Sequence, residues 1–290
     1  MRRDDMDSIM HELLTGERAL FKAKDLFISY SVFEDGESPL KESRNIVLKD
    51  SIFRWKYPLW YAEEITAENI TLVDTARSGI WYTHNLNLKN SIIQAPKTFR
   101  RSSKLKLNNV QLPNAQETLW NCREVEMNKV SVSGDYFAMN SVEIQIDDFS
   151  LVGNYGFDGC RNVVIKNANI ISKDAFWNCE NVVVYDSTII GEYLGWNSRK
   201  ITFVNCVIES EQGMCYMENV QLVDCTVIHT DLAFEYSSVQ ATIKSTIDSV
   251  KNPSSGEINS YGINDLIMDD PEIDREKTEF NTIKEVNHAI

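Results

Sequence analysis

A short motif recurs along most of this 290-residue chain and constrains what it can fold into. It has two apolar residues separated by one position, followed two positions later by Asn or Asp, as in NVVVYDS at residues 181–187. Ten copies follow one another at intervals of 19 to 21 residues. Their closing residues are Asp50, Asn69, Asn90, Asn109, Lys129, Asp148, Asn167, Asp186, Asn205 and Asp224. A period of about 20 residues predicts a repeat architecture.

The spacing within each copy predicts strands. Apolar residues two and four positions before the closing residue lie on one face of a strand. The position seven before is mostly small, and the position ten before is mostly large and apolar, which suits the bends and the interior of a narrow coil. The varying step argues against strict hexapeptide repeats. We therefore predict an all-β fold, a right-handed parallel β-helix of about ten coils with 19–21 residues per coil.

The closing Asn and Asp residues have a physical role in such a coil. Strands of successive coils lie about 4.8 Å apart. Amides at that spacing can hydrogen-bond along the stack, and Asn and Asp also tolerate the geometry of a corner.

The sequence outside the motif predicts caps. Residues 1–35 are expected to hold an N-terminal cap, with a short amphipathic helix over residues 4–16, and a first irregular coil. Residues 36–250 form the parallel β-helix, and residues 251–290 form a C-terminal cap and polar tail.

Composition excludes several classes. The net charge of −14 argues against general nucleic-acid binding, which needs clustered basic residues. No apolar run is long enough for a membrane span, and the start of the chain lacks the apolar core of a signal peptide, so a cytoplasmic location is expected. The six cysteines, which lack Cys-x-x-Cys spacing, are expected to be reduced packing residues, with no metal and no cofactor.

Charge is unevenly distributed along the chain. Residues 41–110 contain 12 basic and 6 acidic residues, although the whole chain has 29 and 43. The excess of basic residues in this stretch is consistent with solvated faces, with an anion-accepting end, or with head-to-tail self-association.

Five of the six tryptophans share the position nine before the closing residue, and tyrosines recur twelve before it. An exposed stripe of this kind could stack on sugar rings, with basic residues beside it for carboxylates or phosphates. Alternatively, loops or a partner cover it, and a register error of one residue would bury every Trp. The predicted ligand-binding residues are Trp60, Trp81, Arg100, Trp120, Trp177, Trp196, Tyr57, Tyr136, Tyr193, Arg77 and Lys97.

Acidic residues lie in or beside the same turns. Glycoside hydrolysis needs two carboxyl groups about 5 to 9.5 Å apart, which pairs from adjacent coils could supply. The catalytic candidates are Glu117, Asp135, Asp158, Asp174 and Glu192, and the sequence leaves open whether the protein is an enzyme.

Several segments resemble an uncharacterised bacterial family of cytosolic, single-stranded right-handed β-helix proteins, a domain of unknown function with pectate-lyase-like architecture. They are FEDGESPLKES (Phe33–Ser43), WKYPLWY (Trp55–Tyr61), GIWYT (Gly79–Thr83), DAFWNCENV (Asp174–Val182) and GEYLGWNS (Gly191–Ser198). The resemblance implies the fold and no activity. The chain lacks the Asn-Thr-Asp, Gly-His-Gly and Arg-Ile-Lys motifs of pectin-degrading enzymes.

Three hypotheses follow. The first is a solenoid binding or scaffold protein that holds a carbohydrate or a protein partner on its aromatic flank. The second is an intracellular carbohydrate-active enzyme, a hydrolase or lyase that uses paired carboxylates. The third is an acidic nucleic-acid mimic.

Overall fold

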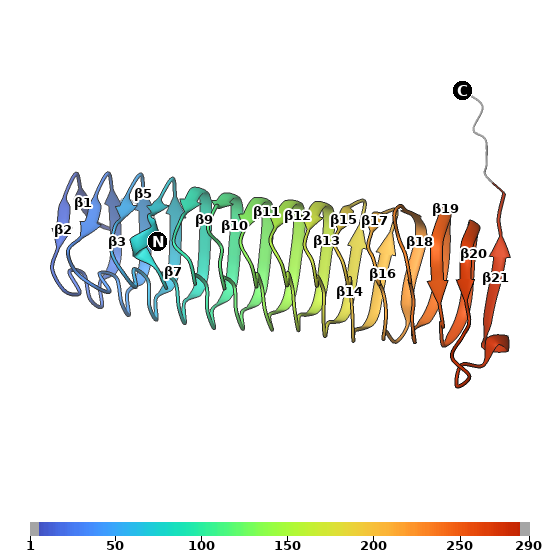
Figure 1. Cartoon of the computed structure of the whole chain (residues 1–290). Coiled ribbons are helices and arrows are strands. Elements are labelled where there is room, and N and C mark those ends of the chain that lie inside the picture. Colours follow the sequence, from blue (N-terminus) through green and yellow to red (C-terminus); the bar gives the residue numbers. More distant parts are fainter. Residues whose placement is uncertain (1–5, 285–290) are drawn as a thin grey trace, which may run out of the picture. The chain divides into compact units, whose positions relative to one another are not determined.

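A computed structural model describes residues 6–284 of the chain, which form strands and turns with two short 3₁₀ helices, η2 (Asp74–Ala76) and η3 (Arg275–Lys277) (Figure 1). No helix among these residues is long and apolar enough to cross a membrane. The chain divides into two compact units, Met1–Val152 and Gly153–Ile290.

The first unit is built from parallel strands in which each coil pairs with the next (Figure 1). Its longer wall contains β1 (Asp7–Met10), β3 (Lys24–Ser29), β5 (Arg44–Lys49), β7 (Glu63–Glu68), β9 (His84–Ile93), β10 (Ser103–Leu112), β11 (Arg123–Ser133) and β12 (Val142–Val152). Short strands form a second wall, which merges with the first from β9 onward because β8 pairs with the end of β9. They are β2 (Leu13–Thr15), β4 (Val32–Glu34), β6 (Ile52–Phe53) and β8 (Thr71–Leu72).

The second unit repeats the arrangement, again with parallel pairing between successive coils (Figure 1). Its longer wall contains β13 (Arg161–Ile171), β14 (Glu180–Tyr185), β16 (Arg199–Val204), β18 (Val220–Val227), β19 (Ser238–Lys251), β20 (Ser255–Ile267) and β21 (Thr278–Thr282). Its short strands are β15 (Thr188–Ile190) and β17 (Val207–Glu209).

The pairing confirms the predicted strand register. Ile46 faces Ile65, and Leu105 faces Val125, as the sequence columns require. These side chains and the interior position ten before the closing residue, such as Phe99, are buried. The all-β, right-handed parallel β-helix is therefore confirmed. Its core consists of side chains from equivalent positions of successive coils.

The closing position adopts the left-handed backbone conformation in all ten copies, with φ between 46° and 55°. Asn and Asp are the side-chain-bearing residues that accept this conformation most readily, which explains the motif. The amides also form the expected ladder, in which Asn109 Nδ2 donates to Asn90 Oδ1 at 2.8 Å and Asn205 Nδ2 donates to Asp186 Oδ1 at 2.7 Å.

The number of coils was predicted too low, since the two units contain about 15 turns rather than ten. At the N-terminal end His11 and Tyr30 occupy the closing position, with φ of 59° and 50°. Their rings stack at 5.0 Å between centroids, which replaces the amide ladder. A search for Asn or Asp therefore misses these coils.

The predicted helix over residues 4–16 is also wrong for the residues described there. β1 and β2 occupy this stretch and pair with β3 and β4. A short helix gains little by itself in water, whereas a strand gains hydrogen bonds from the existing sheet edge. Residues 4 and 5 lie outside the described part. Part of the C-terminal tail is ordered as β21, which pairs with β20, and residues 285–290 lie outside the description.

All six cysteines are free and buried, as predicted. Burial raises the pKa of the Cys122 thiol to about 12 and that of Cys215 to about 12, so these side chains are packing residues with little thiolate.

Candidate functional site

The tryptophan column in the first unit is a stack of rings. Trp60 and Trp81 stack with their ring centroids 5.2 Å apart and their planes nearly parallel, at 8°. The guanidinium of Arg100 continues the stack, 5.1 Å from the Trp81 ring and 4.4 Å from the Trp120 ring. These four side chains are half-buried. The ring faces inside the column therefore cover one another, which leaves their edges to solvent.

Each column tryptophan is also fixed to the backbone of the next coil. The indole Nε1 of Trp60 donates to the carbonyl of Ser78 at 2.6 Å, and that of Trp120 donates to the carbonyl of Tyr136 at 2.6 Å. Trp81, Trp177 and Trp196 make the equivalent bond to the carbonyls of Lys97, Tyr193 and Gln212. The column is thus rigid, and its N–H donors are already used.

In the second unit the stack passes from tryptophan to tyrosine. Trp177 and Trp196 lie 5.9 Å apart at 12°, and Trp196 contacts Tyr216 at 5.0 Å with the rings tilted by 55°. Tyr216 contacts Tyr236 at 5.3 Å. The Tyr216 side chain is 45% exposed, so it offers the aromatic surface that the stacked tryptophans do not.

The predicted tyrosines flank the tryptophan columns. Tyr57 lies 4.4 Å from Trp60 between centroids, and Tyr193 lies 5.3 Å from Trp196. Tyr136 contributes its carbonyl to Trp120, as described above.

The predicted cations differ in their contacts. Lys97 and Arg100 both bind the carboxylate of Glu117, at 3.3 Å and 2.7 Å. Arg77 is exposed, and its carbonyl accepts from the backbone N–H of Tyr57. Two of the three predicted anion-binding cations are therefore already neutralised within the chain.

The structure gives four of the predicted catalytic acids neighbouring partners. Burial of Glu117 opposes its ionisation, but hydrogen bonds from Arg100 and Lys97 outweigh burial and hold its pKa below the usual value. Asp158 accepts a hydrogen bond from Asn178 at 2.8 Å, and Glu192 pairs with Lys173 at 2.9 Å. Asp135 follows Glu117 in the next coil, where its carbonyl accepts from the Glu117 N–H.

Asp174 differs from these acids in its burial, and from Glu117 in the direction of its pKa shift. Its side chain is buried, and desolvation raises its pKa above the usual value, although Lys173 and the Tyr155 hydroxyl favour the ionised form. Glu192 lies in the adjacent coil, since the Asp174 N–H donates to the Glu192 carbonyl at 2.9 Å. The two carboxyl groups interact electrostatically, which raises the pKa of Asp174 further.

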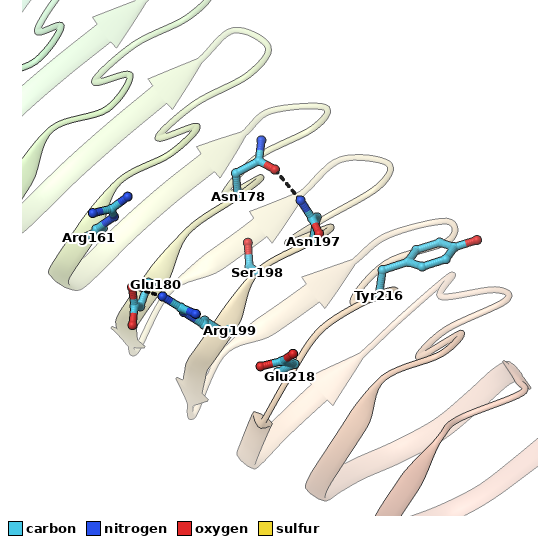
Figure 2. Close-up of a pocket in the computed structure, with 8 residues that line it drawn as sticks. All are labelled: Arg161, Asn178, Glu180, Asn197, Ser198, Arg199, Tyr216 and Glu218. Carbon is cyan, nitrogen blue, oxygen red and sulfur yellow. Dashed lines mark hydrogen bonds and ion pairs between the residues drawn. The ribbon is translucent and has the colours of Figure 1, made fainter. Parts of the chain in front are cut away.

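A polar hollow of about 280 Å³ lies beside Tyr216 in the second unit (Figure 2). Its lining residues are Arg161, Asn178, Glu180, Asn197, Ser198, Arg199, Tyr216 and Glu218. None of these was predicted as a site residue. The sequence signal that could have found them is the asparagine that directly follows Trp177 and Trp196.

Two columns of polar side chains cross the hollow. Arg161, Glu180, Arg199 and Glu218 occupy equivalent positions in successive coils, so charge alternates along the column. Arg199 pairs with Glu180 at 2.7 Å, which raises the pKa of Arg199 and lowers that of Glu180.

The second column consists of amides. Asn178 Nδ2 donates to Asp158, and Asn197 Nδ2 donates to Asn178 Oδ1 at 2.7 Å (Figure 2). The hollow therefore presents planar amide, guanidinium and carboxylate groups beside one exposed aromatic ring. This set can bind a ligand that combines hydroxyl groups with an apolar ring face. Among the residues described, no group of His, Cys, Asp and Glu side chains could hold a metal ion.

Comparison with known proteins finds a family model and solved structures of low similarity. A family model described as "Protein of unknown function (DUF3737)" matches residues 7–281. The A-module of the Azotobacter vinelandii mannuronan C-5 epimerase AlgE4 is similar at 10% identity, with 83% of this chain and 92% of that chain covered and a TM-score of 0.44. PfbA, a surface adhesin of Streptococcus pneumoniae, is similar at 10% identity, with 96% and 83% covered and a TM-score of 0.38. No curated protein matches.

Proposed function

We propose that this chain, which belongs to DUF3737, a family of unknown function, is a non-catalytic scaffold that binds a saccharide in the hollow beside Tyr216. The proposal rests on the geometry of the hollow. The observation that carries the proposal is the combination of an exposed tyrosine with two bonded columns of planar polar groups. The coils hold these groups in place before a ligand arrives, so that binding orders few side chains.

A saccharide matches the chemistry of this hollow. Each sugar ring has an apolar C–H face, which the ring of Tyr216 can cover, and hydroxyl groups that both donate and accept. Asn178 and Asn197 supply both donors and acceptors for those hydroxyls, and Arg161 supplies donors. The Arg161 guanidinium makes no ion pair or hydrogen bond to the side chains described, so it is available to a ligand.

The tryptophan column supports the site rather than forming it. Its ring faces contact one another and its N–H groups bind backbone carbonyls. We infer that Trp177 and Trp196 fix the position of Tyr216, while the ligand binds next to them.

One acid of the hollow, Glu180, favours binding over catalysis. The pairing of Glu180 with Arg199 lowers the pKa of Glu180, so this carboxyl group is ionised at neutral pH. A general acid needs the opposite, a pKa raised toward the working pH.

A hydrolase or lyase remains the second candidate because of Asp174. Its pKa is raised by burial, and Glu192 follows in the next coil, which is the combination expected of an acid with a second carboxylate. Against this role, Glu192 is paired with Lys173.

The nucleic-acid mimic is the hypothesis that the surface favours least. Some surface carboxylates are paired with a cation of a neighbouring coil, as Glu34 with Arg54, Glu126 with Lys106, and Glu180 with Arg199. A mimic of a duplex needs a surface of unpaired negative charge.

Titration calorimetry of the full chain with a panel of neutral and acidic oligosaccharides tests the proposal. We expect Tyr216→Ala to weaken binding about tenfold or more, because it removes the aromatic face. Asn197→Ala should weaken binding less, because it removes one amide. Tyr30→Ala, at a tyrosine 54% exposed in the first unit, is the matched control and should leave binding unchanged.

The same samples distinguish the second candidate. Newly formed reducing ends, or unsaturated products, that disappear in Asp174→Asn would replace the scaffold proposal with an enzyme. Absence of binding to every oligosaccharide in the panel would contradict both saccharide hypotheses.

A further inference from the structure

A second aromatic surface lies in the first unit, one position along the chain from the tryptophan column. Tyr61 and Tyr82 stack at 4.7 Å between centroids and 2° between planes. The Lys41 ammonium lies 5.7 Å from the Tyr61 ring, and the Arg101 guanidinium lies 5.8 Å from the Tyr82 ring. We call Lys41, Tyr61, Tyr82 and Arg101 the tyrosine patch.

The cations of the tyrosine patch are unneutralised. Neither Lys41 nor Arg101 has an ion pair within residues 6–284, and Arg101 donates a hydrogen bond to the Tyr82 hydroxyl at 3.4 Å. By contrast, the nearby Lys106 pairs with Glu126 at 2.9 Å. Arg101 is exposed and Tyr61 is 46% exposed, so the patch presents charge and aromatic surface together.

This composition is typical of a protein-binding surface. Tyr and Arg are enriched among the residues that dominate the binding energy of protein interfaces. The surrounding coils reinforce the charge, because residues 41–110 contain 12 basic and 6 acidic residues. A partner should therefore be acidic and carry some apolar surface.

The chain itself contains such a partner. Residues 265–279 hold seven acidic and two basic residues, and their acidic side chains make no ion pair among the residues described. Leu266, within this segment, is 39% exposed. Because the charge is opposite to that of the tyrosine patch, two copies of the chain are electrostatically complementary.

We propose that the tyrosine patch of one copy binds residues 265–279 of a second copy. The contact is heterologous, since the two surfaces differ, and it can extend a chain of molecules or close a ring. Ion pairs at exposed sites are screened by salt over about 8 Å at physiological ionic strength, so association should weaken as salt is raised.

Sedimentation velocity of the full chain over a range of protein concentrations, at low and at high ionic strength, tests this proposal. We expect association at low salt, and a dissociation constant about tenfold higher in Lys41→Gln/Arg101→Gln, because two ion pairs are lost. Lys106→Gln removes one positive charge outside the patch and should associate nearly as the parent does.

An experiment with exchanged charges is decisive, because two variants that had unfolded would not regain association when they are mixed. Arg101→Glu in one chain and Glu272→Lys/Glu276→Lys in another should each associate weakly alone, and a mixture of the two should associate again. Three results would overturn the proposal. They are a monomer under all conditions, unchanged association in Lys41→Gln/Arg101→Gln, or a monomer whose patch binds a polyanionic glycan.

Discussion

At the residue scale, the left-handed conformation at each closing position decides which side chains the repeat accepts. Asn109 has φ of 53°, and its amide donates to Asn90. A side chain at this position must therefore tolerate a conformation that costs most residues roughly 1–2 kcal/mol, and it must also bond to the neighbouring coil.

Asn109→Val should lower the free energy of unfolding by about 2–3 kcal/mol, since it combines backbone strain with a lost hydrogen bond. Asn109→Gly keeps the backbone relaxed and loses only the bond, so its effect should be smaller. Denaturant titration of both variants measures the difference. An equal loss in the two variants would mean that backbone conformation has no part in the preference.

Glu117 illustrates how a charge contact makes stability depend on pH. Its pKa is lower in the folded chain than the ordinary value of 4.5, so its contribution is present above that value and is lost as pH falls through the lowered pKa. We expect Glu117→Gln to lower the melting temperature at neutral pH, and the difference from the parent to vanish in acid. A difference that is independent of pH would assign the effect to packing instead.

At the element scale, the close approach of successive coils is set by backbone atoms. A Cβ on Gly256, at the start of β20, would lie 1.8 Å from the carbonyl oxygen of Val239, and its φ is 121°. A Cβ on Gly262, in the same strand, would meet no atom closer than 3.7 Å. The first glycine is therefore required by the coil spacing, and the second is not.

Gly256→Ala should lower stability by about 1–3 kcal/mol, because the strand must move away from β19. Gly262→Ala is the matched control and should be nearly neutral. Thermal unfolding followed by circular dichroism compares the two variants, and equal melting temperatures would show that the coil absorbs the extra atom.

At the scale of the whole molecule, the sequence predicted what depends on repetition. Columns such as Ile46, Ile65 and Leu86 could be aligned because parallel coils pair equivalent residues. The N-terminal coils fell outside the ten copies of the motif because His11 and Tyr30 replace the closing amide with stacked rings. A motif defined by residue type cannot recognise a position that keeps its backbone conformation but changes its side-chain chemistry.

The candidate site was harder to predict than the fold. Five Trp share a column in the sequence, but the sequence does not show that their faces stack or that their N–H groups bond to carbonyls 16 to 18 residues away. The hollow depends on Asn178 and Asn197, whose amides look like ordinary surface residues until their alignment is seen. The fold depends on strand register, which the sequence shows. The site depends on side-chain orientation, which the sequence does not show.

The alternating column Arg161, Glu180, Arg199 and Glu218 has a consequence for how the second unit can change length. Loss of one of the two middle coils by an in-frame deletion would bring two like charges side by side, either two guanidinium groups or two carboxylates. Loss of both middle coils would restore the order of opposite charges. Insertions and deletions of an even number of coils therefore keep opposite charges adjacent, and those of an odd number do not. Lineages of this protein should gain or lose coils here in pairs.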